Sequence, residues 1–272
     1  MCELLGLSSS RETTINLSLT VLAQRGENPN MHGDGWGIAF HEGNDVRLIK
    51  DAGPAKNSEW VEFIKQREIH AHDIIAHIRK STIGKAHYSN THPFSRELMG
   101  RIHSFAHNGT LKNIRDNERF KHHNYFPVGE TDSEHSFCNL MDRMKHLWES
   151  HDEIPSVEKR IELLKKFADE MRELGPFNFL YSDGDAFFAH GDRRHDPIAH
   201  KLIWPGLYYL RVECDSNHHV VTDAPESGLK VEGDDDMITL FASVPLNDKD
   251  WKPLEIGEVI AVSRGKIVCS IK

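Results

Sequence analysis

Hydrophobic and polar residues alternate in short runs along the first half of the chain, a pattern typical of half-buried β-strands. Apolar residues at 4–7, directly behind Cys2, predict a buried first strand. Positions 36–40 and 46–48 alternate on either side of Gly43-Asn44, which predicts a β-hairpin. The start of the chain is therefore expected to lie inside a sheet.

Apolar residues at helical spacing predict four helices. The first covers 13–22 and the second covers 57–67. A third begins near Asp132, which is well placed as its N-cap, and a fourth runs over 156–174 and ends at Gly175. The last two helices follow each other, so we expect a helical layer in the middle of the sequence.

The final third of the chain is expected to be mainly β, with hairpins around 182–185 and 263–265. Strands at both ends with helices between them predict packed sheets covered by helices, a layered α+β architecture. Neither an internal repeat nor a linker interrupts the chain, so residues 1–272 are predicted to form a single domain.

Composition narrows the classes of function. The 272 residues carry a net charge of −9, so there is no basic surplus for binding nucleic acid. No apolar run is long enough to span a bilayer and no leader is recognisable, so we expect no membrane partner. The four cysteines are dispersed and the 19 histidines form no ligand array, which predicts neither a disulfide framework, a metal site nor a cofactor. A reducing cytoplasm fits this pattern.

Cys2 is the first candidate for chemistry. If an aminopeptidase removes Met1, the chain begins with a thiol nucleophile and a free α-amino group on one residue. The pKa of an α-amino group lies at about 7.7–8.0, so the amine can act as general base for its own thiol near neutral pH. The alternative interpretation is a small apolar residue that packs in the first strand.

Two predicted strands, 73–78 and 102–106, run into clusters of polar and glycine residues. Behind the second strand, Asn108 and Gly109 offer a side-chain amide and a backbone N–H, a compact pair of donors for an oxyanion. The same dipeptide is also the strongest short signal for a type I′ hairpin turn. These residues alone leave both interpretations open.

Arg79 and Asp132 are candidates for binding the two charged groups of an amino-acid substrate. An arginine fork pairs with an α-carboxylate, and a carboxylate pairs with an α-ammonium group. The alternatives are a surface arginine and a helix N-cap. For Asp132 both can hold, because a cap residue can still present one oxygen to a ligand.

Four short motifs, in order and approximate spacing, resemble those of the class II glutamine amidotransferases, which are N-terminal nucleophile hydrolases. The motifs are Cys2, then His77-x-Arg79-x-x-Thr82-x-Gly84 with His92-Pro93, then His107-Asn108-Gly109, then Thr131-Asp132-Ser133-Glu134. The segments 24–26 and 34–37 also match the early loop and strand of this family, and 243–246 with Trp251 are similar to its small stand-alone members. Each motif is weak by itself, and their joint order makes the resemblance specific.

The resemblance implies a fold and a catalytic set. The fold would be a four-layer αββα sandwich, in agreement with the layered α+β prediction. Cys2 would be the nucleophile and, through its amine, the base. Asn108 and Gly109 would form the oxyanion hole.

The resemblance also implies a substrate-binding set. Arg79, assisted by Thr82, would bind the α-carboxylate of glutamine, and Asp132 would bind its α-amino group. His92 would line the pocket. Lys80 departs from the pattern, because some relatives place an aromatic residue there.

We therefore expect a cysteine amidohydrolase that cleaves the side-chain amide of glutamine or of a γ-glutamyl compound through a γ-glutamyl thioester. Family members with known products carry a synthase domain, which this chain is too short to include. Ammonia would pass to an unidentified partner synthase, or ammonia or an amine would leave in plain hydrolysis. The polar residues 27–34 would suit a lid. The alternative function is a catalytically idle scaffold or amino-acid sensor that uses the same pocket.

Overall fold

Two antiparallel sheets form the centre of the protein. The computed structural model describes residues 2–17, 34–55, 58–67, 69–79, 85–150, 153–196, 199, 201–213, 229–232 and 237–272. The eight-stranded sheet has the order β14 (Lys252–Pro253), β11 (Tyr208–Glu213), β13 (Met237–Ala242), β1 (Glu3–Leu17), β4 (His70–Ile78), β2 (Trp36–Glu42) and β3 (Asp45–Asp51), with β12 (Leu229–Glu232) paired to β1. The six-stranded sheet has the order β16 (Lys266–Ile271), β15 (Val259–Ser263), β8 (Phe187–His190), β7 (Phe177–Ser182), β6 (Arg101–Gly109) and β5 (Phe94–Leu98).

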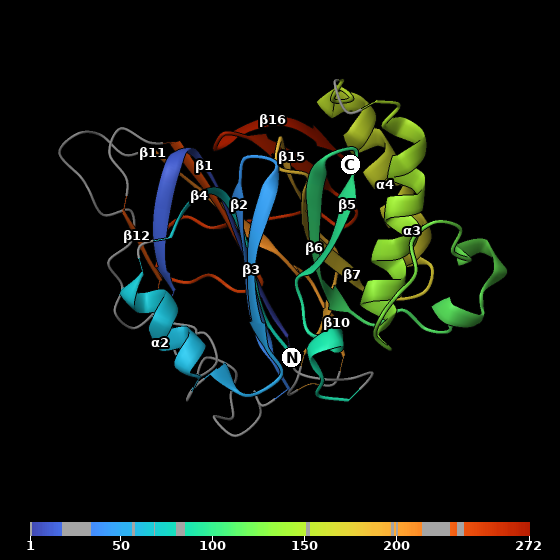
Figure 1. Ribbon diagram of the computed structural model, residues 1–272, viewed down its shortest axis with the longest axis horizontal. Helices are drawn as coiled ribbons and strands as arrows, with labels where there is room; N and C mark the ends of the chain where they lie inside the picture. Colours follow the sequence, from blue (N-terminus) through green and yellow to red (C-terminus); the bar gives the residue numbers. More distant parts are fainter. Residues whose placement is uncertain are drawn as a thin grey trace.

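Helices cover both outer faces of this pair of sheets. Helices α3 (Asp132–Leu147) and α4 (Val157–Arg172) lie on the six-stranded sheet, while α2 (Glu59–Gln66) lies beside the eight-stranded one (Figure 1). The short strands β9 (Arg194–His195) and β10 (Leu202–Ile203) pair with each other, and η2 (Tyr88–Asn90), η3 (Ile114–Asp116) and η4 (Glu118–Phe120) are single 3₁₀ turns. The layers are thus the αββα sandwich that the family resemblance implies. Among the described residues, no helix is long and apolar enough to cross a membrane.

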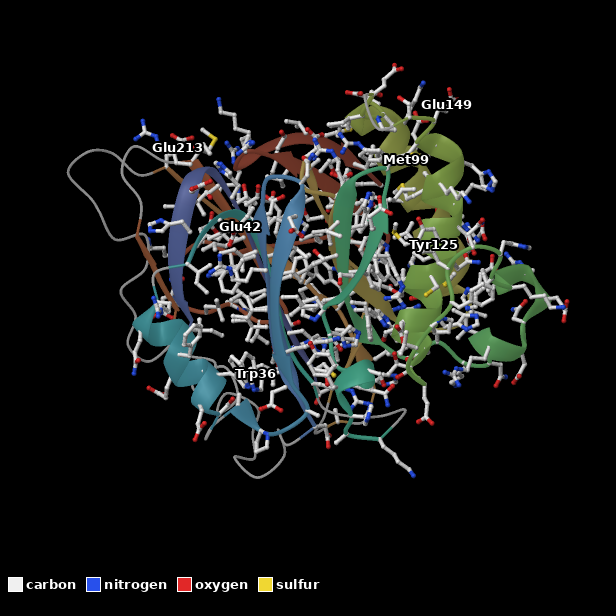
Figure 2. All side chains as sticks on the ribbon, viewed as in Figure 1. Trp36, Glu42, Met99, Tyr125, Glu149 and Glu213 are labelled. Atoms are coloured by element: carbon white, nitrogen blue, oxygen red, sulfur yellow. The ribbon has the colours of Figure 1, made fainter. Side chains whose placement is uncertain are left out.

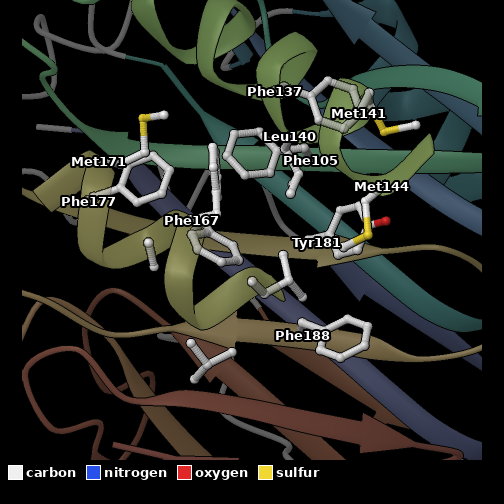
Figure 3. Close-up of a cluster of buried hydrophobic side chains, with 14 of the residues drawn as sticks. Phe105, Phe137, Leu140, Met141, Met144, Phe167, Met171, Phe177, Tyr181 and Phe188 are labelled. Atoms are coloured by element: carbon white, nitrogen blue, oxygen red, sulfur yellow. The ribbon is translucent and has the colours of Figure 1, made fainter. Parts of the chain in front are cut away.

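Aromatic and aliphatic side chains fill the layer between the six-stranded sheet and its helices (Figures 2 and 3). Phe105 of β6 stacks on Phe137 of α3 with ring centroids 5.3 Å apart, and Phe167 of α4 meets Phe177 of β7 edge-on. All four side chains are fully buried. The large buried apolar area here stabilises the sheet that carries Asn108 and Gly109.

Aliphatic side chains and two stacked rings fill the layer between the two sheets. Leu4, Ala39 and Ala106 belong to this inner cluster, together with Phe187 and Phe241, whose ring centroids are 5.5 Å apart. A Cβ atom on Gly6 would lie 2.6 Å from the ring of Phe187, so this position of β1 admits no side chain. Because successive side chains of a strand point to opposite faces, the neighbours two positions away also face the inner layer.

The structure corrects two local predictions. Residues 13–17 continue strand β1 instead of forming a helix, and they pair with β4 and β12, as in Thr13 with Ala71 and Ile15 with Val231. The rest of that predicted helix lies outside the described residues. The N-cap of α3 is Thr131, whose Oγ1 accepts a hydrogen bond from the Glu134 N–H at 3.1 Å, and Asp132 is the first helical residue. The other predicted hairpins and helices are confirmed with small shifts of their ends.

Polar side chains also occupy the inner layer, where Ser8 of β1 pairs with Asp73 of β4. Asp73 Oδ2 accepts a hydrogen bond from Ser182 of β7 at 2.8 Å. Nearby, His41 of β2 contacts Ser104 of β6 across the two sheets. Burial raises the pKa of Asp73 to about 6, although the hydrogen bonds of Ser8 and Ser182 act in the opposite direction.

Replacing Asp73 by asparagine is expected to raise the free energy of unfolding near neutral pH by up to about 3 kcal/mol. Burial lifts the pKa of the folded carboxyl from 3.8 to about 6, so the folded state holds a proton that the unfolded chain has lost. The wild-type protein therefore loses stability as pH rises through this window, and the variant does not. Thermal denaturation at about pH 4 and about pH 7.5 measures the difference, which should nearly vanish at the lower pH.

Asp142 provides a control of opposite sign. Burial raises the pKa of its carboxyl, but hydrogen bonds outweigh this effect and lower the pKa overall. Two of those bonds come from the N–H groups of His123 and Asn124, at 2.8 and 2.7 Å. Asp142→Asn should therefore cost stability at neutral pH. If Asp73→Asn raised the free energy of unfolding equally at both pH values, the raised pKa of Asp73 would be contradicted.

Candidate active site

Cys2 stands at the start of β1, at one end of the inner layer. The ladder between β1 and β4 ends at the pair Glu3 and Ile78, so Cys2 and Arg79 are the next residues on neighbouring strands. Leu4 faces the six-stranded sheet, and the alternation of the strand directs Cys2 to the same side. Cys2 is partly exposed and forms no disulfide. The first strand thus delivers this cysteine to the mouth of the inter-sheet layer.

Asn108 reaches Cys2 from the opposite sheet. It lies on β6 two residues after Ala106, which faces the inner layer, so its side chain points toward the eight-stranded sheet. Its Nδ2 donates a hydrogen bond to the backbone carbonyl oxygen of Cys2 at 2.8 Å. On its other side β6 pairs with β7, where Asn178 donates from its amide to the Asn108 carbonyl at 3.4 Å. Cys2 and Asn108 are 106 positions apart in the sequence, and this contact unites them.

Gly109 ends β6 at a place with no room for a side chain. A Cβ atom there would lie 1.8 Å from the carbonyl oxygen of Pro176 and 2.6 Å from His107 Nε2. Asn108 and Gly109 continue the ladder with Asn178 and Phe177, so the dipeptide belongs to a strand and is not a hairpin turn. The hairpin interpretation of this dipeptide is therefore wrong.

Arg79 is buried, and the surface interpretation of this residue is also wrong. Its side chain is 3% exposed, and its Nη1 donates to the carbonyl oxygens of Asp34 at 3.1 Å and Lys85 at 3.3 Å. The Arg79 N–H also donates to the Gly35 carbonyl at 2.8 Å. These bonds hold the guanidinium at the end of β4, beside the strand that begins with Cys2. Thr82 lies outside the described residues, as do 24–26 and most of 27–34.

His92 is buried next to this group. Its ring lies against His77 with centroids 4.1 Å apart and against Phe94 at 4.5 Å, both in tilted arrangements, and His77 pairs with Leu4 in the β1–β4 ladder. Burial lowers the pKa of His92 well below its ordinary value and lowers that of His77 to about 3, with neighbouring Arg79 acting in the same direction. Both imidazoles are therefore neutral at physiological pH, while the arginine remains charged.

Asp132 lies at the N-terminal end of α3, where its carboxylate contacts the segment that follows Gly109. Its Oδ2 accepts a hydrogen bond from the Leu111 N–H at 2.7 Å, and its Oδ1 accepts one from the Ser133 N–H at 2.9 Å. His107 of β6 contacts the Ser133 hydroxyl at 2.8 Å, which joins the same helix end to the strand. Asp132 is 7% exposed. The carboxylate thus lies next to the candidate oxyanion hole and positions the chain behind it.

Comparison with known proteins decides the family. The model of the class-II glutamine amidotransferases matches residues 1–272. This chain belongs to the class II glutamine amidotransferases. Members of this family cleave the side-chain amide of glutamine, and the chain is accordingly an enzyme of the amidotransferase and hydrolase type.

Relatives support this membership over most of their length. An uncharacterized protein of Methanocaldococcus jannaschii is 35% identical over 280 residues, which cover 100% of this chain and 72% of that protein. The Escherichia coli protein YafJ, which is provisionally named a glutamine amidotransferase, is 35% identical over 273 residues, covering 95% of this chain and 96% of its own.

Solved structures share the fold. The crystal structure of a predicted glutamine amidotransferase from Pseudomonas aeruginosa has a TM-score of 0.71 and 34% identity, and the match covers 98% of this chain and 100% of that one. The glutamine phosphoribosylpyrophosphate amidotransferase from B. subtilis has a TM-score of 0.59 at 14% identity, covering 100% of this chain and 49% of that one. The αββα sandwich is therefore that of the N-terminal nucleophile hydrolases.

Sequence reasoning gave no role to Ser243, which the structure places beside Asn108 and the start of β1 in this candidate site. Ser243 follows β13, and its Oγ accepts a hydrogen bond from the Leu4 N–H at 3.0 Å and lies 3.5 Å from Asn108 Nδ2. The segment 243–246 resembled the small stand-alone relatives, which was the only signal. Within the described part of the chain, no group of three or more His, Cys, Asp or Glu side chains could hold a metal ion.

Proposed function

We propose that this amidotransferase cleaves the side-chain amide of glutamine or of a γ-glutamyl compound through a thioester on Cys2. The observation that carries the proposal is the 2.8 Å bond from Asn108 Nδ2 to the Cys2 carbonyl, because it brings an amide donor to the residue with the thiol. An oxyanion hole requires such a donor, held in advance where negative charge develops.

The acylation step uses groups of this chain alone. After removal of Met1, the α-amino group of Cys2 takes the thiol proton, and the sulfur attacks the γ-carbonyl carbon of the substrate. The carbonyl oxygen becomes an oxyanion that Asn108 Nδ2 and the Gly109 N–H stabilise. The C–N bond then breaks, and the leaving amine takes the proton from the α-ammonium group. A γ-glutamyl thioester remains on Cys2.

Water completes the cycle. The α-amino group accepts a proton from an attacking water molecule, the second tetrahedral intermediate collapses, and the C–S bond breaks. The departing thiolate takes a proton from the α-ammonium group, and the products of this half-reaction are glutamate and the regenerated thiol. The reaction as drawn needs neither a cofactor nor a metal ion.

Arg79 and Asp132 would hold the amino-acid end of the substrate, with Thr82 assisting. The buried guanidinium beside Cys2 suits an α-carboxylate, and the neighbouring rings of His92 and His77 are neutral because burial lowers their pKa values. Oδ1 of Asp132 accepts hydrogen bonds from the N–H and the hydroxyl of Ser133, and Oδ2 accepts one from the Leu111 N–H, which leaves a lone pair of Oδ2 for an α-ammonium group. His92 would line the pocket wall.

Plain hydrolysis is the form of the reaction that we favour over transfer to a partner synthase. The E. coli relative aligns over 96% of its length, whereas the B. subtilis phosphoribosyl enzyme has as much chain again outside the match. The E. coli relative thus lacks the extra length in which a fused synthase domain that uses ammonia would lie. We place the reaction in a reducing cytoplasm, since Cys2, Cys138 and Cys269 form no disulfide.

Mass spectrometry and a substrate screen test the proposal. Intact mass should show loss of Met1, and a glutamine-like diazoketone should add to Cys2 as one covalent label. Released ammonia and released primary amines should then be followed over a panel of γ-glutamyl amides. Active protein that retains Met1 would overturn the mechanism. Amino-acid binding without label or turnover would show an idle sensor, and ammonia release only with an added synthase would show transfer.

A further inference from the structure

The hydroxyl of Ser243 lies between the strand that carries the nucleophile and the amide that serves the oxyanion. Strand β13 pairs with β1 up to Ala242 and Leu5. Beyond that pair, the Ser243 N–H donates to the Leu4 carbonyl at 3.1 Å, and the Ser243 Oγ accepts from the Leu4 N–H at 3.0 Å. A side-chain oxygen thus replaces the backbone acceptor that a longer strand would supply. The chain can then turn away at Pro245, which has no N–H to donate.

The same oxygen also faces Asn108 from the other sheet. Asn108 Nδ2 lies 3.5 Å from Ser243 Oγ and 2.8 Å from the Cys2 carbonyl oxygen. The Cys2 carbonyl oxygen and Ser243 Oγ both accept hydrogen bonds from this nitrogen. If the amide were flipped, Asn108 Oδ1 would face the Cys2 carbonyl oxygen, and two acceptors would oppose each other. The contact with Ser243 is long, so it orients the amide while holding the second N–H only weakly, and this N–H remains available to an oxyanion.

Burial makes these contacts hard to replace. Ser243 is 0% exposed, and Asn108 is 6% exposed. Without the hydroxyl, the Leu4 N–H would lose its partner in a place that water does not reach. The start of β1 would then shift relative to Asn108, and displacements of this kind can cost two orders of magnitude in rate.

We infer that Ser243 is a positioning residue for amide cleavage: its hydroxyl fixes Cys2, through Leu4, against the oxyanion donor Asn108. The inference rests on the proposed function of Cys2 and Asn108. In this assignment Ser243 contacts no reacting atom. It is also distinct from Arg79 and Asp132, the two groups proposed to bind the substrate. Its loss should therefore slow the chemical step and leave substrate affinity nearly unchanged.

Three variants test the inference. Ser243→Ala should lower kcat about 10- to 100-fold with KM changed by less than about threefold, and it should slow diazoketone labelling of Cys2 by a similar factor. Ser243→Thr keeps the oxygen and should restore kcat to within about threefold of wild type. Ser10→Ala is the matched control, because Ser10 Oγ accepts the Met237 N–H at 3.0 Å at the opposite end of β13. This control should leave kcat and labelling unchanged.

Hydrogen exchange separates positioning from general loss of stability. In Ser243→Ala the Leu4 amide should exchange faster than in Ser10→Ala, with the core of α3 protected equally in both. Each labelling rate constant is normalised to the fraction of molecules that finally becomes labelled. Protein that is permanently unfolded therefore does not make the labelling step look slow. A Ser243→Ala variant with the wild-type kcat, or with losses equal to those of Ser10→Ala, would overturn the inference. So would a folded Ser243→Thr variant that is as slow as Ser243→Ala.

The result also separates this inference from the proposed function. Wild-type protein that is neither labelled at Cys2 nor active on any γ-glutamyl amide overturns the proposed function and the inference with it. Wild-type protein that is labelled and active, with an equally fast Ser243→Ala variant, overturns the inference alone.

Discussion

Cys2→Ala is expected to lower kcat for amide hydrolysis by at least about 10³-fold, because it removes the sulfur on which the proposed thioester forms. The substitution removes one sulfur atom from a partly exposed position at the start of β1, so the fold should persist. Turnover of glutamine and of the best γ-glutamyl amide, followed as ammonia or amine release, measures the effect. Circular dichroism and thermal denaturation should match those of the wild-type protein.

Cys138→Ala is the matched control. This thiol is buried on α3, and burial raises its pKa to about 11, so it is a weak nucleophile at neutral pH. Activity and diazoketone labelling of Cys138→Ala should equal those of the wild-type protein. Substantial turnover by Cys2→Ala, or a label found on Cys138, would mean that another group attacks the amide.

Asn108→Ala is expected to lower kcat by about 10²- to 10³-fold, the cost of losing one oxyanion donor, or about 3–4 kcal/mol. The substitution also removes the 2.8 Å bond to the Cys2 carbonyl. Neither effect touches Arg79 or Asp132, so KM should change much less than kcat. Steady-state kinetics at saturating and limiting substrate separate the two constants.

Asn139→Ala serves as the control for this loss. Asn139 is a buried asparagine on α3 whose Oδ1 accepts a hydrogen bond from Arg143 at 3.0 Å, in another layer of the molecule. Its removal should affect stability but not kcat. If Asn108→Ala raised KM and spared kcat, the amide would bind substrate and would not stabilise the transition state.

Local patterns account for most of the elements. Alternation over 36–48 predicted the β2–β3 hairpin, and apolar spacing after Ser156 predicted α4, which Ser156 caps through a hydrogen bond to the Lys159 N–H. The segment 13–17 shows where such reasoning fails. Its β-branched threonines and isoleucine favour a strand, but the spacing of Ile15 with later leucines also fits a helix. Pairing with β4 and β12 decides the outcome.

The order of the motifs gave the family resemblance, and their chemistry named Cys2, Asn108 and Gly109 as candidates, since a thiol, an amide and a glycine N–H are what amide cleavage through a thioester requires. The tertiary structure decided how these groups meet. It showed that Asn108 and Gly109 end a strand, and that Arg79 is buried. No local pattern could supply these results, because they depend on the packing of one sheet against the other.

Ser243 illustrates the same limit most clearly. Its hydroxyl contacts Leu4 across 239 positions of sequence, and it contacts Asn108 across 135. A serine after an apolar strand carries no local signal of that role, because any small polar residue can end a strand. The sequence by itself determined which chemical groups are present and in what order. The pairing of β13 with β1, and the packing of the two sheets, decided which of them share one site.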